Sequence, residues 1–397
     1  MIEPLIKIAI LIGGLMTAAA YFVLLERRMA AWIQDRVGPN RVGIPLTEVR
    51  LLGLGQPLAD GAKFILKEEY TPAHVDRRLF LLAPIVILVA ALATFAVVPF
   101  GSIKTSGEPI QLVVAPGADV GMVYVFALSS IAVYGVILGG WASNNKYSFL
   151  GGLRSSAQLI AYELPLGLGI LGVVVAAGSL DLGQIIQAQS ETGMWFIFAQ
   201  PLGFFVFVVA AFAEAARLPF DLPECEQELI GGYHTEYSGI KLLLFLVAEF
   251  LHMIAASFLI VILFLGGWHF WGLTGGSDEV NWFAALLRIG VLFAKIFVVI
   301  LFFMLVRWSW PRFRFDQLMA LAWKVMLPLG LINFVAIAVV EQLKMNWHTG
   351  PAVDWMFALL SWAVAIGAWA AISIAGPLVA DNRPRRQLEA FEIDTQV

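Results

Sequence analysis

The densest group of side chains able to hold or move protons lies in residues 214–240, between two long apolar runs. Carboxylates at a membrane boundary are costly to bury unless paired, hydrated or protonated, so they often mark a proton, ion or ligand site. The plain alternative is a solvated loop. Here the acids alternate with Leu, Pro, Phe and Ile directly after a predicted helix, which favours a folded, partly buried site. The segment holds six acids, Glu214, Asp221, Glu224, Glu226, Glu228 and Glu236, and one base, Arg217.

Three more charged residues, Glu163, Glu249 and Lys295, fall inside apolar runs. Each alone is compatible with a satisfied structural charge, but together with Glu214 they favour a polar path through the membrane. Glu214 and Arg217 are three residues apart and are expected to pair if the helix continues. Neighbouring acids titrate as a coupled group, so one added charge redistributes protons among all of them.

The composition predicts an all-α polytopic membrane protein. The chain of 397 residues is 60% hydrophobic and only 14% charged, with a mean hydropathy of +0.84. Its apolar runs are continuous, which indicates helices and not the alternating strands of a barrel. We predict one membrane domain, residues 1–397, in which the first span is retained. The nine predicted spans are Leu5–Leu25, Leu79–Phe100, Val120–Trp141, Ala157–Ala177, Met194–Ala213, Leu242–Gly266, Phe283–Val306, Leu318–Val340 and Trp355–Ile374.

The distribution of basic residues predicts the orientation of the spans. Most of the 25 Lys and Arg fall in the loops after spans 1, 3, 5 and 7 and in the tail 377–397. By the positive-inside rule this side is cytoplasmic, or the equivalent face in an organelle, which places the N-terminus on the opposite side. We therefore expect a multi-pass membrane protein.

The first basic loop, residues 26–78, predicts a short interfacial helix. Gln56, Asp60, Lys63 and Lys67 recur on one helical face, with apolar residues on the other. The helix is either a surface anchor or one wall of a polar cavity. Arg27, Arg36 and Arg41 are either positive-inside markers or donors to that cavity.

Several redox sites are excluded by residue counts. The single Cys225 cannot hold an iron–sulfur cluster, and only His252 lies well inside a span. Neither a phosphate-binding loop nor a dinucleotide fingerprint is present. Any electrons must therefore come from a partner.

Five motifs in order resemble the quinone-site membrane subunits of respiratory complex I, a family that includes the bacterial H-type subunits and mitochondrial NADH dehydrogenase subunit 1. The resemblance covers about residues 1–345. One departure is Ala216, where many relatives carry Asn. The motifs are ERRMAAWIQDRVGPNRVG (26–43), LGQPLADGAKFILKE (54–68), GGLRSSAQLIAYELPLG (151–167), AEAARLPFDLPECEQELIGGYHTEYSG (213–239) and VRWSWPRFRFDQLMALAWKVMLPL (306–329).

The resemblance implies roles for individual residues. Arg27, Arg36, Asp60, Lys63 and Phe220 would line the path of quinone, which is a substrate and not a bound cofactor. The acids from Asp221 to Glu228 would lie under the quinone chamber. Glu163 and Glu214 would begin a proton-coupling route that also includes Arg217, Glu249 and Lys295.

The resemblance further implies a subunit of a proton-translocating NADH:quinone oxidoreductase, in a bacterial inner membrane, with no redox centre of its own. Iron–sulfur clusters and FMN would sit in partner subunits. Its partners would be the hydrophilic quinone-module subunits, adjacent membrane subunits, quinone and lipid, and not nucleic acid.

The alternatives to this function are a proton-coupled secondary transporter, the membrane anchor of a related hydrogenase, or a purely structural anchor. A transporter is expected to place its polar site at mid-membrane between repeats, whereas the densest polar signal here is at the basic boundary.

Overall fold

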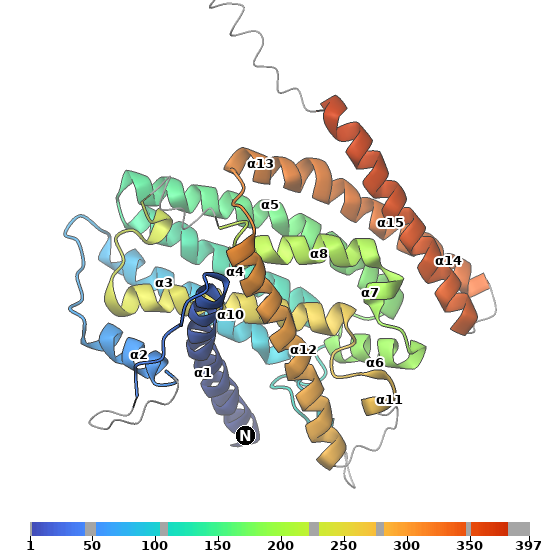
Figure 1. The fold of residues 1–397 in the computed structure, drawn as a ribbon, viewed down its shortest axis with the longest axis horizontal. Coiled ribbons are helices and arrows are strands. Elements are labelled where there is room, and N and C mark those ends of the chain that lie inside the picture. Colours follow the sequence, from blue (N-terminus) through green and yellow to red (C-terminus); the bar gives the residue numbers. More distant parts are fainter. Residues whose placement is uncertain are drawn as a thin grey trace, which may run out of the picture.

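The computed structural model describes residues 2–43, 53–103, 110–221, 230–274, 282–346 and 351–379. Within these ranges it confirms an all-α polytopic membrane fold (Figure 1). The only strands in the described ranges form a two-residue hairpin, in which Ser102 pairs with Gln111 and Ile103 with Ile110.

The helices are α1 (Ile2–Ile33), α2 (Gln56–Leu66), α3 (Arg77–Thr94), α4 (Gly121–Ala142), α5 (Lys146–Ala177), α6 (Leu182–Thr192), α7 (Phe196–Ala199), α8 (Pro201–Glu214), α10 (Gly239–Phe264), α11 (Trp271–Thr274), α12 (Trp282–Ser309), α13 (Phe315–Ala320), α14 (Leu327–Asn346) and α15 (Pro351–Val379). The short elements are η1 (Phe95–Val97), β1 (Ser102–Ile103), β2 (Ile110–Gln111), η2 (Gly232–His234) and the π-helical turn η3 (Leu321–Met326).

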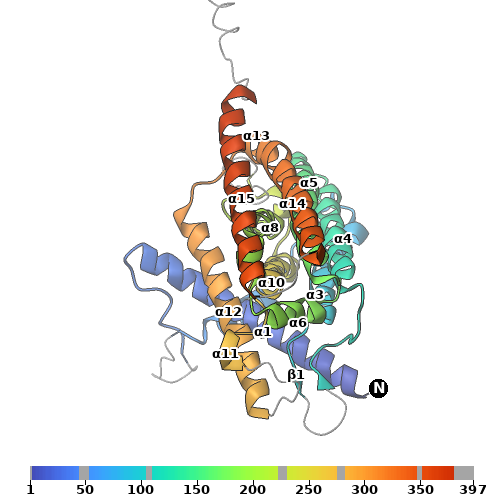
Figure 2. The same ribbon diagram turned by 90° about the vertical axis from the view of Figure 1, so that its right-hand side faces the viewer.

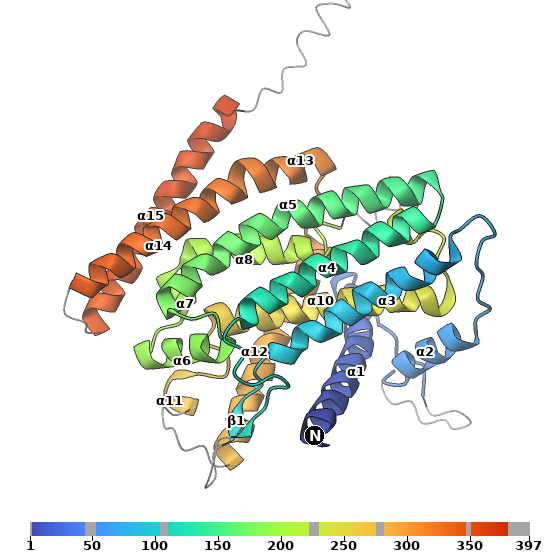
Figure 3. The same ribbon diagram turned by 180° about the vertical axis from the view of Figure 1, so that it is seen from behind.

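Five helices form a closed ring that becomes the frame of the site. In the order α3, α4, α5, α8 and α10, each helix packs on the next, and α10 returns to α3. Seen nearly end-on in Figure 2, these helices surround a common axis, and α14 lies outside the ring against α5 and α8. Helices α1 and α12 cross the ring helices at a steep angle, and both pack on α10 (Figures 1 and 3).

Glycines allow the ring helices to approach closely. A Cβ added to Gly135 of α4 would lie 2.9 Å from the Ile87 Cβ of α3. A Cβ on Gly151 of α5 would lie 2.7 Å from the backbone of Gly232. Such small residues permit the close helix contacts on which packing in membranes depends.

Eight helices of the described chain are long and apolar enough to cross a membrane, and α8 is a shorter ninth apolar helix. The fifth predicted span is divided because Gln200 has the non-helical angles φ −137° and ψ 62°, and Pro201 then starts α8. At about 1.5 Å per residue, the 14 residues of α8 reach about two thirds of the hydrocarbon thickness.

Two boundaries differ from the sequence-based prediction. Helix α1 continues to Ile33, so the start of the predicted loop 26–78 is helical. Helix α8 ends at Glu214, and Ala216 has a positive φ of 49°. The helical spacing expected to bring Glu214 and Arg217 together is therefore lost.

Candidate functional site

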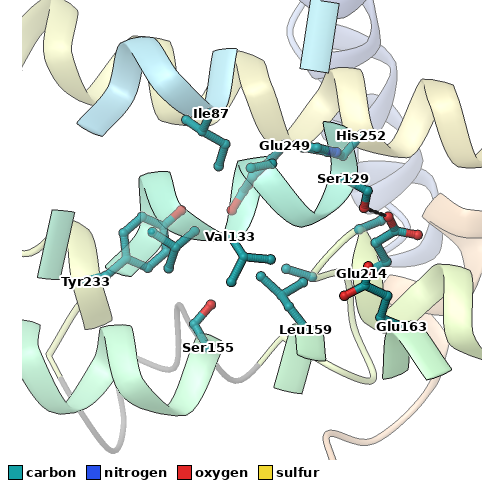
Figure 4. Close-up of a pocket in the computed structure, with 14 residues that line it drawn as sticks. Ile87, Ser129, Val133, Ser155, Leu159, Glu163, Glu214, Tyr233, Glu249 and His252 are labelled. Atoms are coloured by element: carbon teal, nitrogen blue, oxygen red, sulfur yellow. Dashed lines mark hydrogen bonds between the residues drawn. The ribbon is translucent and has the colours of Figure 1, made fainter. Parts of the chain in front are cut away.

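A small cavity lies inside the ring of α3, α4, α5, α8 and α10. Its volume of about 40 Å³ suffices for a few water molecules. Figure 4 shows carboxylates entering it from three different helices: Glu163 from α5, Glu214 from α8 and Glu249 from α10. Ser129, Ser155, Tyr233 and His252 are its other polar lining residues. The structure thus brings together three of the acids selected from sequence.

Two consecutive serines of α4 hold two of these carboxylates. The Ser129 hydroxyl donates to Glu214, and the Ser130 hydroxyl donates to Glu163. Adjacent positions on a helix point about 100° apart, so one turn of α4 reaches α8 on one side and α5 on the other. The hydroxyls supply the hydrogen bonds that carboxyl groups need inside a membrane.

The cavity continues to the backbone of Ala215 and Ala216, where the chain leaves α8. The Gln158 side-chain amide of α5 fixes this exit by donating to the carbonyls of Ala213 and Phe220, at 2.9 and 2.8 Å. Phe220 is buried against the rings of Tyr162 and Phe313. The segment 215–221 is therefore held rigidly at the edge of the acid-lined cavity.

Glu26 links this segment to two crossing helices. Its buried carboxylate on α1 accepts hydrogen bonds from Arg217, at 3.2 Å, and from Arg307 of α12. The Arg217 guanidinium also lies 4.3 Å from the centre of the Phe250 ring of α10. A buried carboxylate shared by two guanidinium groups is strongly bound, because charge-assisted hydrogen bonds offset its lost hydration.

The acidic run is described only at its beginning. Asp221 is buried and accepts a hydrogen bond from Arg312 at 3.1 Å. Glu224, Glu226 and Glu228 lie outside the described residues.

The residues predicted to line the quinone path separate into two groups. Asp60 of α2 accepts a 2.6 Å hydrogen bond from Arg27 of α1, so the predicted interfacial helix is tied to the first span. Arg36 donates to Gln34 at 2.7 Å, and Lys63 is exposed. Phe220 belongs to the buried segment beside Arg217.

Lys295 is not one of the residues that line the cavity. Its ammonium donates to the carbonyls of Leu265, Gly267 and His269, at 2.6, 2.9 and 2.6 Å, and lies 4.4 Å from the centre of the Trp195 ring. These carbonyls follow the end of α10, where backbone acceptors lack helical partners. Burial, together with the charges of Lys295 and Arg288, lowers the pKa of His269 in this loop.

Sequence reasoning missed three polar residues of the site: Glu26, Ser129 and Ser130. Glu26 begins the first motif, and its position three residues before Met29 and four before Ala30, on the buried side of α1, was a usable signal. The serine pair is an adjacent polar pair inside an apolar span, which is a pattern that favours a functional site.

Comparisons with known proteins agree over most of the chain. Residues 6–338 match the family described as NADH dehydrogenase. An H-type NADH-quinone oxidoreductase subunit from Cytophaga hutchinsonii is 45% identical over 340 residues, which are 84% of this chain and 96% of that protein. The corresponding protein of Geobacter metallireducens is 47% identical over 341 residues, or 86% of this chain and 97% of that protein. That of Leptospira biflexa is 44% identical over 355 residues, or 86% of this chain and 96% of that protein. The chain therefore belongs to the NADH dehydrogenase family of membrane subunits.

Proposed function

We propose that the chain is the membrane subunit of a proton-translocating NADH:quinone oxidoreductase that forms part of the quinone chamber and the start of the proton-coupling route. One observation carries the proposal: a cavity lined by Glu163, Glu214 and Glu249 ends at the segment that carries Arg217, Phe220 and Asp221. The names of the relatives support the same assignment.

The geometry suggests how charge in the chamber would act on the acids. Quinone reduction consumes protons and creates a transient charge imbalance in a poorly hydrated chamber. That charge would arise near Arg217 and Asp221, within a few residues of the Glu214 carboxyl. Charges interact strongly where water is scarce, so the protonation of Glu214 would respond to the redox state of the quinone.

Water would connect the acids with one another. Ser129 and Ser130 each hold one carboxylate, and a hydroxyl both donates and accepts a proton. The cavity has room for the water molecules that such a relay needs. A proton gained by Glu214 from the chamber side would then pass inward to Glu163 or Glu249.

Electrons would come from partners. In this assignment the iron–sulfur clusters and FMN belong to the hydrophilic arm, which docks on the basic loops. Arg27, Arg36, Asp60 and Lys63 would lie beside the entry of quinone from the membrane, where α2 meets the end of α1. A cytoplasmic position of these loops follows from the positive-inside rule.

Replacing Glu163 and Glu214 with Gln tests the proposal. Gln keeps size and hydrogen bonding but cannot titrate. In proteoliposomes that contain the whole assembled complex, we expect quinone reduction and proton pumping to fall together. Removal of a proton-transfer group typically costs about 10²–10⁴-fold, and water in the cavity would reduce that loss to roughly tenfold.

Glu191→Gln is the matched control, since Glu191 is exposed on α6 and accepts a hydrogen bond from Gln187 at 2.8 Å. This variant should behave like the parent. Electron transfer from NADH to a water-soluble acceptor should stay unchanged in all three variants. A fully active Glu163→Gln, Glu214→Gln double variant would refute the proton route.

A further inference from the structure

His252 is a titratable residue of the cavity to which the proposed function gives no role. It lies in the middle of α10, three residues after Glu249, so both side chains lie on one face of that helix. Both line the cavity, as does Ser129, which holds Glu214 (Figure 4). His252 therefore lines the same cavity as the carboxyl groups contributed by α8 and α10.

The surroundings of His252 offer no partner that would explain it as a structural residue. Across the described part of the chain, the structure gives its ring nitrogens no hydrogen bond and its ring no aromatic contact. An imidazole has two polar nitrogens, and leaving them unsatisfied within a membrane costs free energy. Both neighbours in sequence, Leu251 and Met253, are buried apolar residues. The cavity is the polar space that this side chain lines, and water within it is the remaining partner.

The groups that face the cavity define the chemistry available to His252. They are Glu163 of α5, Glu214 of α8, Tyr233 of η2 and Glu249 of its own helix, with the Ser129 and Ser155 hydroxyls. Helix α3 contributes only the apolar Ile87. Each titratable group that faces the cavity is thus acidic apart from His252. An imidazole ring accepts a proton at one nitrogen and releases another from the second. In a carboxyl or hydroxyl group, the accepting and releasing atoms are not as far apart.

We propose that His252 is a proton-carrying residue that connects Glu249 with Glu214 through water in this cavity. One nitrogen takes up a proton from the side of the Ser129–Glu214 pair, and the other releases a proton toward Glu249. One proton enters and one leaves, so the ring ends in the other tautomer, and a flip of the ring restores the first. The inference rests on the proposed function, and it adds a base to a route otherwise made of acids.

Two substitutions separate proton transfer from hydrogen bonding. His252→Asn places an amide near the position of Nδ1, and His252→Gln places one near Nε2. If His252 only holds water or fills space, one of these variants should retain parental activity. If it carries protons, neither should, because an amide does not titrate near neutral pH. We expect both variants to reduce quinone and pump protons about tenfold more slowly in proteoliposomes, a smaller loss than that typical of a general acid or base.

His74→Gln is the matched control, since His74 is exposed and its carbonyl accepts from Asn144. Transfer of electrons to a water-soluble acceptor should be equal in all variants. Parental pumping in either His252 variant would overturn the inference, and so would failure of both variants to assemble, because the residue would then be structural. If Glu163→Gln and Glu214→Gln lose activity while a His252 variant keeps it, the route stands without His252. If all of them stay active, the proposed function itself fails.

Discussion

Individual side chains divide the site into carboxyls with neutral partners and a carboxylate with charged partners. Among the cavity carboxyls, those of Glu214 and Glu163 accept hydrogen bonds from the hydroxyls of Ser129 and Ser130. Glu26 instead lies between two guanidinium groups, Arg217 and Arg307, which balance its charge. The site thus combines a fixed ion cluster around Glu26 with carboxyls that are held by hydroxyls.

Glu26→Gln should show that the fixed cluster is structural. The change leaves two buried or half-buried guanidinium groups without their counter-charge, and breaking a buried pair costs about 3–5 kcal/mol. We expect a lower thermal unfolding temperature of the complex and less assembled complex in membranes. Glu3→Gln, which breaks the exposed Lys7–Glu3 pair at 2.8 Å, should change neither. An unaltered unfolding temperature in Glu26→Gln would contradict this assignment.

At the scale of helices, the sequence predicted well which segments are helical and poorly at which residues the helices end. Continuous apolar runs predicted the eight long helices and the region of the divided fifth span, because hydrophobic length is a property of local sequence. The spacing of polar and apolar residues predicted α2. The break at Gln200 and the end of α8 at Glu214 depend on tertiary contacts, such as Gln158 holding the carbonyls of Ala213 and Phe220. For this reason the expected Glu214–Arg217 pair was replaced by Ser129–Glu214 and Glu26–Arg217.

Lys295 illustrates the same limit. A charge inside an apolar span is typical of a functional path, and the sequence alone does not reveal that α10 ends opposite it. The carbonyls after Phe264 give Lys295 three acceptors. Stabilising the C-terminal end of α10 is therefore an alternative to its proposed role in proton coupling.

The ring also depends on close contact between α5 and the segment around η2. Gly151→Ala would place a Cβ 2.7 Å from the Gly232 backbone, and overpacking of this kind costs about 1–3 kcal/mol. We expect a lower unfolding temperature of the complex with Gly151→Ala. Gly167→Ala in the same helix is the control, because nothing lies within 4 Å of its Cβ position. Equal unfolding temperatures for the two variants would show that α5 and η2 adjust without cost.

At the scale of the molecule, the polar groups are unequally divided between the two ends of the bundle. The ends of α1, α8 and α12 meet around Glu26, while α6 lies at the other end (Figure 1). The family match ends at residue 338, so α15 lies beyond it. This helix packs on α7, α8 and α14 and contributes no residue to the acid-lined cavity. All five helices of the ring around the cavity, in contrast, lie within the family match.

Labelling of introduced cysteines tests the orientation of the molecule. In a Cys225→Ser background, we expect a membrane-impermeant maleimide to modify Gln187→Cys in intact spheroplasts and Lys67→Cys only in inverted vesicles. Both positions are exposed, and they lie on α6 and directly after α2, at opposite ends of the bundle. Detergent-solubilised complex, in which both cysteines should react, controls for burial under partner subunits. The reverse pattern would place the quinone entry, the ion cluster around Glu26 and the docking loops outside the cytoplasm. An electron-donating arm that works on cytoplasmic NADH would then be unable to reach this subunit, and the proposed function would have to be abandoned.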